Sequence, residues 1–297
     1  MPEPTPPLPV VIDTDPGVDD AIALLLALGS SALRVAGVTT VAGNAGIEQV
    51  TANATAVLDL AGAPADLPVA MGAAGPLAGG PRVPDEPVHG PGALGGVVLP
   101  PGTRLVAGTP ATGGHGPDGR ADGTAAVDLI ARVARTHPGE LVLLALGPLT
   151  NVARLLERDP EAAGMLAGVV HMGGAAFAPG NVTPAAEFNT YCDPEATRVV
   201  LTSGLPVRLV PLDVTRRHGV RECRVHDATA VVALLDPERF CWRRHPVDVE
   251  CVGELTRGAL VTDVYGRTGR PATVELALDL DPDPVRHRLL AVLEDAR

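Results

Sequence analysis

The chain has 297 residues and a formal net charge of −12, with 35 acidic residues against 23 basic ones. This acidic balance argues against binding along the phosphate backbone of a nucleic acid. All of the basic residues are arginine, which excludes Schiff-base chemistry on lysine and any P-loop that needs its lysine. No apolar run is long enough to cross a membrane, and the start of the chain lacks the pattern of a signal peptide. The four cysteines show no C-x-x-C spacing, which indicates reduced thiols, so we expect a cytoplasmic protein.

Strand and helix signals alternate along the chain. Residues 1–8 are expected to form a disordered Pro-rich lead, and residues 9–297 a single domain. The first strand is expected at Leu8–Ile12 and the first helix at Val18–Leu28. Further strands are expected at Arg34–Val41, Leu67–Met71, Leu141–Leu146, Val169–Met172, Val207–Leu212, Val247–Val252 and Thr273–Leu278, and helices at Ile47–Ala61, Thr124–Thr136, Thr150–Glu157, Asp193–Ser203, His226–Leu235 and Pro284–Asp295. This order predicts an α/β fold with a mainly parallel open sheet and helices on both faces. The Gly/Pro-rich stretch 72–123 is expected to be a functional or mobile loop.

Acidic side chains crowd together where the first strand meets the first helix. Asp13, Asp15, Asp19 and Asp20 lie within a few residues of one another, on either side of a turn at Pro16-Gly17. Carboxylates packed this closely repel, and their burial is costly unless a cation or hydrogen bonds compensate. A helix N-terminus can offset one of them, but not the whole set. Oxygen ligands suit Ca²⁺ or Mg²⁺, so the cluster predicts a site for a hard divalent cation. The alternative is that Asp19 and Asp20 are ordinary acids in the first turn of the helix and that Asp13 caps a turn.

Amide and acidic side chains also follow the later strands. In a parallel sheet the carboxyl ends of the strands meet at one edge, where ligands bind. Such side chains can hydrogen-bond vicinal hydroxyls, so together with a cation they predict a polyol site. Each residue alone also fits a plain turn, capping or surface role. The residues are Asn44, Asn181, Glu187, Asn189, Asp213 and Asp227, with His89 and His226 as the histidines.

Taken in order, these segments resemble the inosine-uridine-preferring nucleoside hydrolase family. The motifs that carry the resemblance span nearly the whole chain. They are Asp13-Thr14-Asp15-Pro16-Gly17-Val18-Asp19-Asp20-Ala21, Thr39-Thr40-Val41-Ala42-Gly43-Asn44, Val88-His89-Gly90, Gly147-Pro148-Leu149-Thr150-Asn151, Met172-Gly173-Gly174, Ala186-Glu187-Phe188-Asn189 with Asn181, Asp193-Pro194-Glu195-Ala196, and Val225-His226-Asp227. The resemblance implies hydrolysis of the N-glycosidic bond of ribonucleosides to base and ribose by water that Ca²⁺ activates. It also implies a homo-oligomer, a dimer or a tetramer.

The same resemblance assigns roles to individual residues. It implies one Ca²⁺ held by Asp15, Asp20, Asp227 and the main-chain carbonyl of Leu146, with Asp13 in support. Asp15 is the expected base for the attacking water, and His226 the candidate proton donor to the leaving base. The residues expected to bind substrate are Asp19, Asn44, His89, Asn181, Glu187 and Asn189, with Asn181 and Glu187 on the side of the 5′ hydroxyl.

Two segments depart from the family pattern. Gly92 and Ala93 follow His89 where the family usually carries an acidic or other polar residue. The interval 216–225, between Thr215 and His226, is shorter than the largely helical stretch that covers the base in the family. The short interval predicts that the enzyme holds ribose well and tolerates several bases.

Two other functions are compatible with parts of the sequence. One is a nucleoside- or ribose-binding protein that has lost turnover together with the cover over its site. The other is a Mg²⁺-dependent phosphatase of the haloacid dehalogenase type, because Asp13-Thr14-Asp15 matches its D-x-D motif. That phosphatase would leave Asp19-Asp20 and Glu187-Phe188-Asn189 unexplained. An assay for reducing sugar over a panel of ribonucleosides distinguishes the hydrolase from both alternatives, because neither of them would form free ribose. Phosphate release would then indicate the phosphatase, and ligand binding by calorimetry the binding protein.

Overall fold

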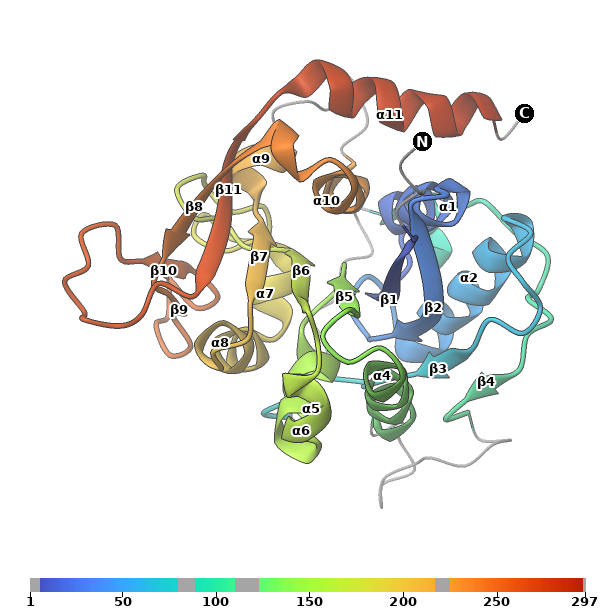
Figure 1. The fold of residues 1–297 in the computed structure, drawn as a ribbon, viewed down its shortest axis with the longest axis horizontal. Coiled ribbons are helices and arrows are strands. Elements are labelled where there is room, and N and C mark those ends of the chain that lie inside the picture. Colours follow the sequence, from blue (N-terminus) through green and yellow to red (C-terminus); the bar gives the residue numbers. More distant parts are fainter. Residues whose placement is uncertain (1–5, 80–88, 110–122, 217–224, 296–297) are drawn as a thin grey trace.

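The computed structural model describes residues 6–79, 89–109, 123–216 and 225–295 as a single α/β domain (Figure 1). The strands are β1 (Leu8–Thr14), β2 (Leu33–Thr40), β3 (Val69–Met71), β4 (Val106–Ala107), β5 (Val142–Ala145), β6 (Gly168–Met172), β7 (Val207–Val210), β8 (Phe240–His245), β9 (Val247–Val249), β10 (Leu260–Thr262) and β11 (Val274–Leu280). The helices are α1 (Val18–Gly29), α2 (Ile47–Leu60), α4 (Thr124–Thr136), α5 (Thr150–Arg158), α6 (Pro160–Gly164), α7 (Phe188–Cys192), α8 (Pro194–Thr202), α9 (Leu212–Thr215), α10 (His226–Leu235) and α11 (Pro282–Asp295), with short 3-10 turns η1 (Pro91–Ala93) and η2 (Pro237–Arg239).

The main sheet has nine strands in the order β4-β3-β2-β1-β5-β6-β7-β11-β8. Neighbouring strands pair in parallel, except for the antiparallel pair β11–β8. Strands β9 and β10 form a separate antiparallel pair. The predicted fold class, a mainly parallel open sheet in one α/β domain, is therefore confirmed.

Helices cover both faces of this sheet, as Figure 1 shows. Helices α4, α5, α6 and α8 lie on one face, and α1, α10 and α11 lie on the other. Within β1, Val11 packs on the side of the sheet that α4, α5, α6 and α8 cover, whereas Val10 and Ile12 pack on the side that α1 and α10 cover. Burial on both faces explains why this strand is a continuous apolar run rather than an alternating one.

The strand order places the polar residues of β1 beside those of its neighbours. Strand β1 lies between β2 and β5, and the direction in which later strands are added reverses at this point. In the sheet register, Asp13 stands opposite Thr39 on one side and Ala145 on the other. Ligands of open α/β sheets bind in the crevice outside the carboxyl ends of such strands. The acidic motif follows the carboxyl end of β1, at the point where the strand order reverses.

Several expected elements differ in the structure. Residues 1–5 of the expected lead lie outside the described residues, and Leu8 already belongs to β1. The stretch 72–123 contains η1 and β4 in its described part, so it is not loop throughout. The strand expected at Val247–Val252 ends at Val249 and pairs outside the main sheet.

Five elements of the structure are not predicted by the sequence patterns, namely β8, β10, α6, α7 and α9. Strand β8 contains Arg243 and Arg244 and lies at the edge of the sheet, where one side of a strand faces solvent. Helices α6, α7 and α9 have only four or five residues each, too few for a 3.6-residue apolar period to be visible.

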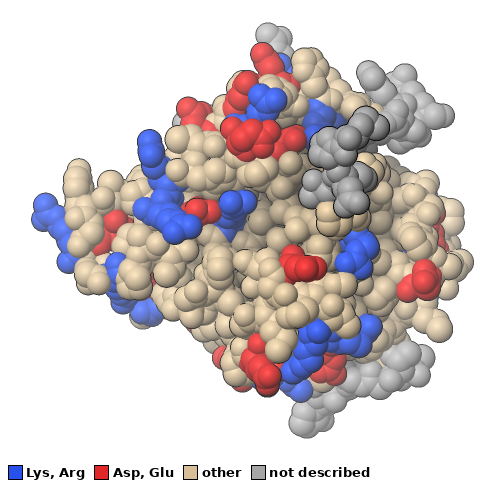
Figure 2. All heavy atoms as spheres, viewed as in Figure 1, with Lys and Arg blue, Asp and Glu red and all other residues tan. Residues whose placement is uncertain are grey.

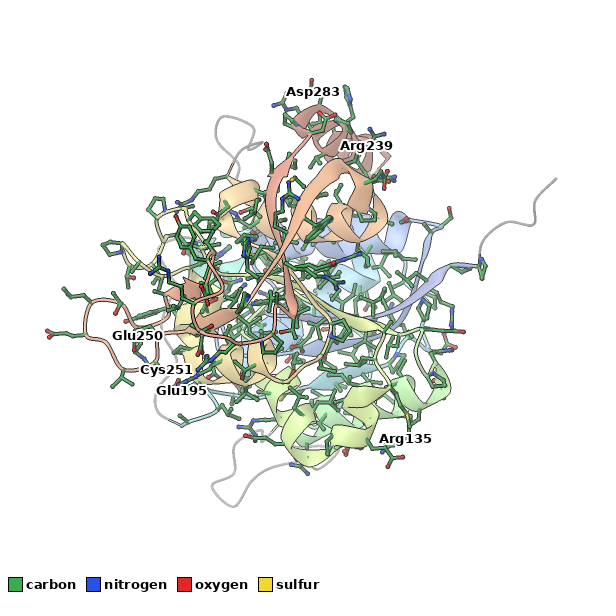
Figure 3. All side chains as sticks on the ribbon, turned by 60° about the vertical axis from the view of Figure 1, so that its left-hand side comes forward. Arg135, Glu195, Arg239, Glu250, Cys251 and Asp283 are labelled. Atoms are coloured by element: carbon green, nitrogen blue, oxygen red, sulfur yellow. The ribbon has the colours of Figure 1, made fainter. Side chains whose placement is uncertain are left out.

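The β9–β10 pair is anchored to the domain through α8. The guanidinium of Arg257 makes two hydrogen bonds to Glu195, both at 2.8 Å, and also contacts the carbonyl of Cys251. Glu195, Glu250 and Cys251 lie together at this end of the molecule in Figure 3.

Positive and negative groups alternate on the face drawn in Figure 2, and the described part of this face shows no continuous basic surface. In the described parts of the chain, no helix has both the length and the apolar content needed to span a bilayer.

Candidate active site

The first two aspartates are buried at the end of β1. Asp13 Oδ1 accepts hydrogen bonds from Thr39 Oγ1 at 2.6 Å and from Asn151 Nδ2 at 2.8 Å. Asp15 Oδ2 accepts one from the backbone N–H of Asn44 at 2.7 Å. Asp13 Oδ2 and Asp15 Oδ1 have no hydrogen-bond partner among the described residues, although both atoms are inaccessible to solvent. Each buried carboxylate therefore keeps one oxygen for another partner.

Two glycines let the backbone approach Asp15 closely. A Cβ at Gly43 would lie 2.0 Å from Asp15 Oδ2, and a Cβ at Gly147 would lie 2.5 Å from Asp15 Oδ1. Neither distance is compatible with a side chain. These glycines come from the loops after β2 and β5, so three strand ends converge on this carboxylate.

A second group of carboxylates forms around the start of α1. Asp19, Asp20 and Asp227 are buried, and each places one oxygen within 4.8 Å of the others. Asp20 is held by Thr14 Oγ1 at 2.5 Å, by the N–H of Gly17 at 3.0 Å and by Asn44 Nδ2 at 3.1 Å. Asp227, far away in the sequence, joins the group because α10 packs against α1.

Burial and mutual repulsion raise the pKa values of these acids. Burial raises the pKa of Asp13 to about 6, and burial together with the charge of Asp20 raises the pKa of Asp19 to about 6. The pKa of Asp15 is raised well above its ordinary value by burial and then by Asp20. The pKa of Asp227 is raised well above its ordinary value by burial and then by Asp19, Asp20 and Asp15. The positive charge of a divalent cation would offset both the cost of burying these charges and their mutual repulsion, so the donor set fits a hard cation.

The predicted metal ligands are brought together only in part. Asp20 and Asp227 belong to the cluster of three carboxylates, but its third member is Asp19 instead of Asp15. Asp15 is close enough for Asp20 to raise its pKa. The carbonyl of Leu146 accepts a hydrogen bond from Asn189 Nδ2 at 2.6 Å. A carbonyl oxygen has two lone pairs, so this bond leaves room for a second partner.

Glu187 and Asn181 lie on the segment that follows β6. Glu187 is the N-cap of α7, and its carboxylate accepts the backbone N–H groups of Gly174, Asn189 and Thr190 at 2.7, 2.9 and 3.1 Å. Burial is the largest effect on this side chain and raises its pKa. Asn181 is exposed, and its Oδ1 accepts the N–H of Phe188 at 2.9 Å.

Both predicted histidines lie beside the acidic residues in the chain or in space. His89 Nδ1 accepts the N–H of Val18 at 3.3 Å and lies 4.0 Å from Asp19 Oδ1. His226 is the first residue of α10, next to Asp227, and its Nδ1 is 2.7 Å from Thr215 Oγ1. Thr215 therefore fixes the orientation of the His226 ring.

Several side chains without a role predicted from the sequence hold these acids in place. Asn151 donates from Nδ2 to Asp13 and to the carbonyl of Thr40 at 2.9 Å, and its Oδ1 accepts the N–H of Ala73 at 2.9 Å. Thr14 and Thr39 hold Asp20 and Asp13. Asn151 closes the motif after β5, which was the available signal. Thr14 and Thr39 also belong to the motifs quoted above, but their partners follow only from the turn after β1 and from the sheet register.

Comparison with known proteins gives a consistent result. A family model described as inosine-uridine preferring nucleoside hydrolase matches residues 10–222 and 216–287. Uridine nucleosidase 1 of Arabidopsis thaliana is 36% identical over 285 residues, which cover 82% of this chain and 80% of that protein. Non-specific ribonucleoside hydrolase RihC of Shigella boydii is 36% identical over 305 residues, which cover 92% and 94%.

Solved structures agree with the sequence matches. The purine-preferring ribonucleoside hydrolase from Gardnerella vaginalis has a TM-score of 0.85 at 26% identity, covering 97% of this chain and 98% of its own. A structure described as an inosine-guanosine nucleoside hydrolase has a TM-score of 0.84 at 30% identity, covering 96% and 98%. The chain is therefore an enzyme of the inosine-uridine preferring nucleoside hydrolase family.

Proposed function

We propose that this enzyme hydrolyses the N-glycosidic bond of ribonucleosides to a free base and ribose, with one Ca²⁺ bound at the acidic cluster. The observation that carries the proposal is the group of buried carboxylates around the carboxyl end of β1, two of which keep an oxygen without a partner among the described residues. The family match and the named hydrolases favour catalysis over simple ligand binding, and they argue against the phosphatase.

The cation is proposed to be held by Asp15, Asp20, Asp227 and the Leu146 carbonyl. When bound there, a hard cation would supply the positive charge that polarises water and the sugar hydroxyls. The charge balance supports this assignment, since five carboxylates are buried here, whereas the arginines that form ion pairs in the described residues pair with other acids. The unpartnered Asp15 Oδ1 supports the inclusion of Asp15, which is absent from the cluster of three.

Asp15 is proposed to take the proton from the attacking water. Its Oδ2 is occupied by the Asn44 N–H, and its Oδ1 remains free to accept among the described residues. Gly43 and Gly147 close around the carboxylate and fix its orientation. A base that is held in one orientation needs little rearrangement in the transition state.

Ribose is proposed to lie between the residues that follow β1 and β2 and the residues that follow β6. Asp19 and Asn44 would bind the vicinal hydroxyls, with His89 next to Asp19. Asn181, Glu187 and Asn189 would bind the side that carries the 5′ hydroxyl. The geometry supports these roles, because Asn44 contacts both Asp15 and Asp20 while Asn189 reaches the carbonyl of Leu146.

His226 is proposed to donate a proton to the departing base. Thr215 holds Nδ1, so Nε2 is the nitrogen that would face the base. Protonation removes the negative charge that develops as the bond breaks. We further propose tolerance for several bases, because the interval 216–225 is short in the sequence; its residues 217–224 lie outside the described residues.

The deciding experiment measures release of reducing sugar from purified enzyme over a panel of purine and pyrimidine ribonucleosides. We expect cleavage of several of them, much slower cleavage of 2′-deoxynucleosides, and loss of activity after stringent chelation with recovery on addition of Ca²⁺. A site that binds a hydroxyl discriminates strongly against its absence, by a factor on the order of 10⁴ in favourable cases. Equal rates on uridine and 2′-deoxyuridine would remove the ribose assignments, and full activity of metal-free enzyme would remove the cation.

We also propose that the enzyme assembles as a dimer or a tetramer and that it acts in the cytoplasm. Sedimentation of the purified enzyme tests the oligomer, and a monomer at assay concentrations would contradict it.

A further inference from the structure

Helix α9 follows β7 and connects two parts of the proposed site. It contains only Leu212–Thr215 and lies between β11, β7 and α10 (Figure 1). On one side the N–H of Leu212 donates to the carbonyl of Gly174 at 2.9 Å, at the start of the segment that leads to Asn181 and Glu187. On the other side Thr215 contacts His226.

Asp213 of α9 holds the first half of this segment. Its Oδ2 accepts the N–H of Ala176 at 2.9 Å, and its Oδ1 accepts the N–H groups of Phe177 and Ala178 at 2.9 and 3.1 Å. Three successive backbone donors on one carboxylate fix the path of the chain, and such charge-assisted hydrogen bonds are stronger than neutral ones.

Arg216, directly after α9, holds the second half. Its Nη1 donates to the carbonyl of Pro179 at 2.7 Å, and its Nη2 donates to the carbonyl of Gly180 at 2.8 Å. The planar guanidinium contacts both carbonyls at once, which an ammonium group does less well. The next residue is Asn181, so the chain is fixed up to the residue that is proposed to bind the 5′ hydroxyl side.

We propose that Asp213 and Arg216 are positioning residues for the 5′ end of ribose, which they serve by clamping residues 176–180 so that Asn181 is presented to the substrate. The inference rests on the proposed function. Neither side chain is assigned a contact with substrate. Their effect is transmitted through the backbone to Asn181, and from there through the hydrogen bond between Asn181 Oδ1 and the N–H of Phe188 to the turn that carries Glu187. The clamp uses only residues before 217, so it does not depend on a longer helical cover.

The test compares Arg216→Ala, Arg216→Lys and Asp213→Asn with the parent enzyme on uridine and on 5′-deoxyuridine, which lacks the hydroxyl in question. We expect kcat/KM on uridine to fall about 10- to 100-fold in Arg216→Ala and Asp213→Asn, because small misplacements of a positioning group cost rates of this order. On 5′-deoxyuridine we expect each variant to stay within about threefold of the parent enzyme, since that substrate does not use the clamped contact. Arg216→Lys should restore part of the loss. In an Asn181→Ala background the same changes should add little.

Matched controls exist in the chain. Asp263→Asn removes a carboxylate that likewise accepts two backbone N–H groups, from Arg267 and Thr268, in a different loop. Arg135→Ala removes an arginine that is paired with Asp159 at the end of α4 (Figure 3). Both controls should keep parent rates on both substrates.

Equal losses on uridine and 5′-deoxyuridine would show a merely structural role and overturn the inference while leaving the proposed function intact. Unchanged rates on both substrates would also overturn the inference. A parent enzyme that cleaves no ribonucleoside would overturn both the function and the inference.

Discussion

Asn151 shows how a buried amide can organise an acidic site without contacting substrate. It is fully buried and connects the Asp13 carboxylate, the Thr40 carbonyl and the Ala73 N–H. One side chain thereby ties β1, β2 and the segment after β3 together. Its removal would leave a buried carboxylate with one donor fewer.

Asn151→Ala should lower the free energy of unfolding by about 3 kcal/mol, because three buried polar groups lose their partner. Urea denaturation measures this change. The control is Gln49→Ala on the exposed side of α2, which removes only the hydrogen bond to Asn53 and should cost about 0.5 kcal/mol or less. Equal losses in the two variants would contradict the role of Asn151.

His171 is a fully buried titratable residue of β6. Its Nδ1 lies 3.1 Å from the carbonyl of Ala145, and its Nε2 has no partner among the described residues. Burial lowers its pKa from 6.5 to about 4. Between these two values the unfolded chain binds a proton that the folded chain does not, so this residue makes the enzyme less stable as the pH falls.

His171→Asn should abolish that contribution. In the parent enzyme, the lowered pKa of His171 should reduce the free energy of unfolding by about 2 kcal/mol when the pH falls from 7.5 to 5. This figure follows from the linkage between proton binding and folding. Asp13 and Asp19, whose raised pKa values act with the opposite sign, are present in both proteins and cancel in the difference. Urea denaturation at several pH values measures the effect, and exposed His287→Asn is the control. A constant difference between parent and His171→Asn across this range would disprove the prediction.

At the scale of elements, the loops after β2 and β5 matter more for their backbone than for their side chains. Gly43 and Gly147 are required because any Cβ would collide with the carboxylate of Asp15. The sequence motifs that contain these glycines are therefore signs of close packing around a functional group as well as of turns.

Gly43→Ala should displace Asp15 and lower kcat/KM on uridine at least about 100-fold. Overpacking should also cost about 1 to 3 kcal/mol of unfolding free energy. The control is Gly29→Ala in the last turn of α1, where a Cβ would meet nothing within 4 Å. That change should keep parent activity and raise stability by about 0.5 to 1 kcal/mol. Steady-state kinetics and urea denaturation measure both variants, and normal activity of Gly43→Ala would show that Asp15 need not stay in place.

At the scale of the whole molecule, binding of the proposed cation at the acidic cluster would be coupled to folding. The cluster joins the start of α1 to the start of α10, so the binding site exists only when the two helices are packed together. A ligand that binds only the folded chain stabilises it.

Ca²⁺ at 100 times its dissociation constant should raise the free energy of unfolding by about 2.7 kcal/mol. Asp227→Asn should remove most of this increase, because it takes one charge from the cluster. Exposed Asp283→Asn (Figure 3) should keep it. Thermal denaturation with and without Ca²⁺ measures the effect. An increase that survives in Asp227→Asn would place the cation elsewhere.

The sequence by itself determined the fold class, the place of the acidic motif and the family. Continuous apolar strands that alternate with helices leave few topologies open, and the motif at Asp13–Asp20 stands directly after the first strand. Local patterns succeeded there because strand, turn and helix are adjacent in the chain. They failed for α9 and β8, whose short or edge positions carry weak periodicity.

Only the tertiary structure decided which side chains meet. The packing of α10 on α1 brings Asp227 to Asp19 and Asp20. The sheet register places Thr39 beside Asp13. Helix α9 brings Asp213 and Arg216 to the backbone that precedes Asn181. These contacts join residues that are distant in sequence, and their energies depend on burial and on a dielectric that the folded chain creates. For the same reason, the sequence could name the acids as candidates, but the raised pKa values of Asp13, Asp15, Asp19 and Asp227 arise only when the helices and strands close around them.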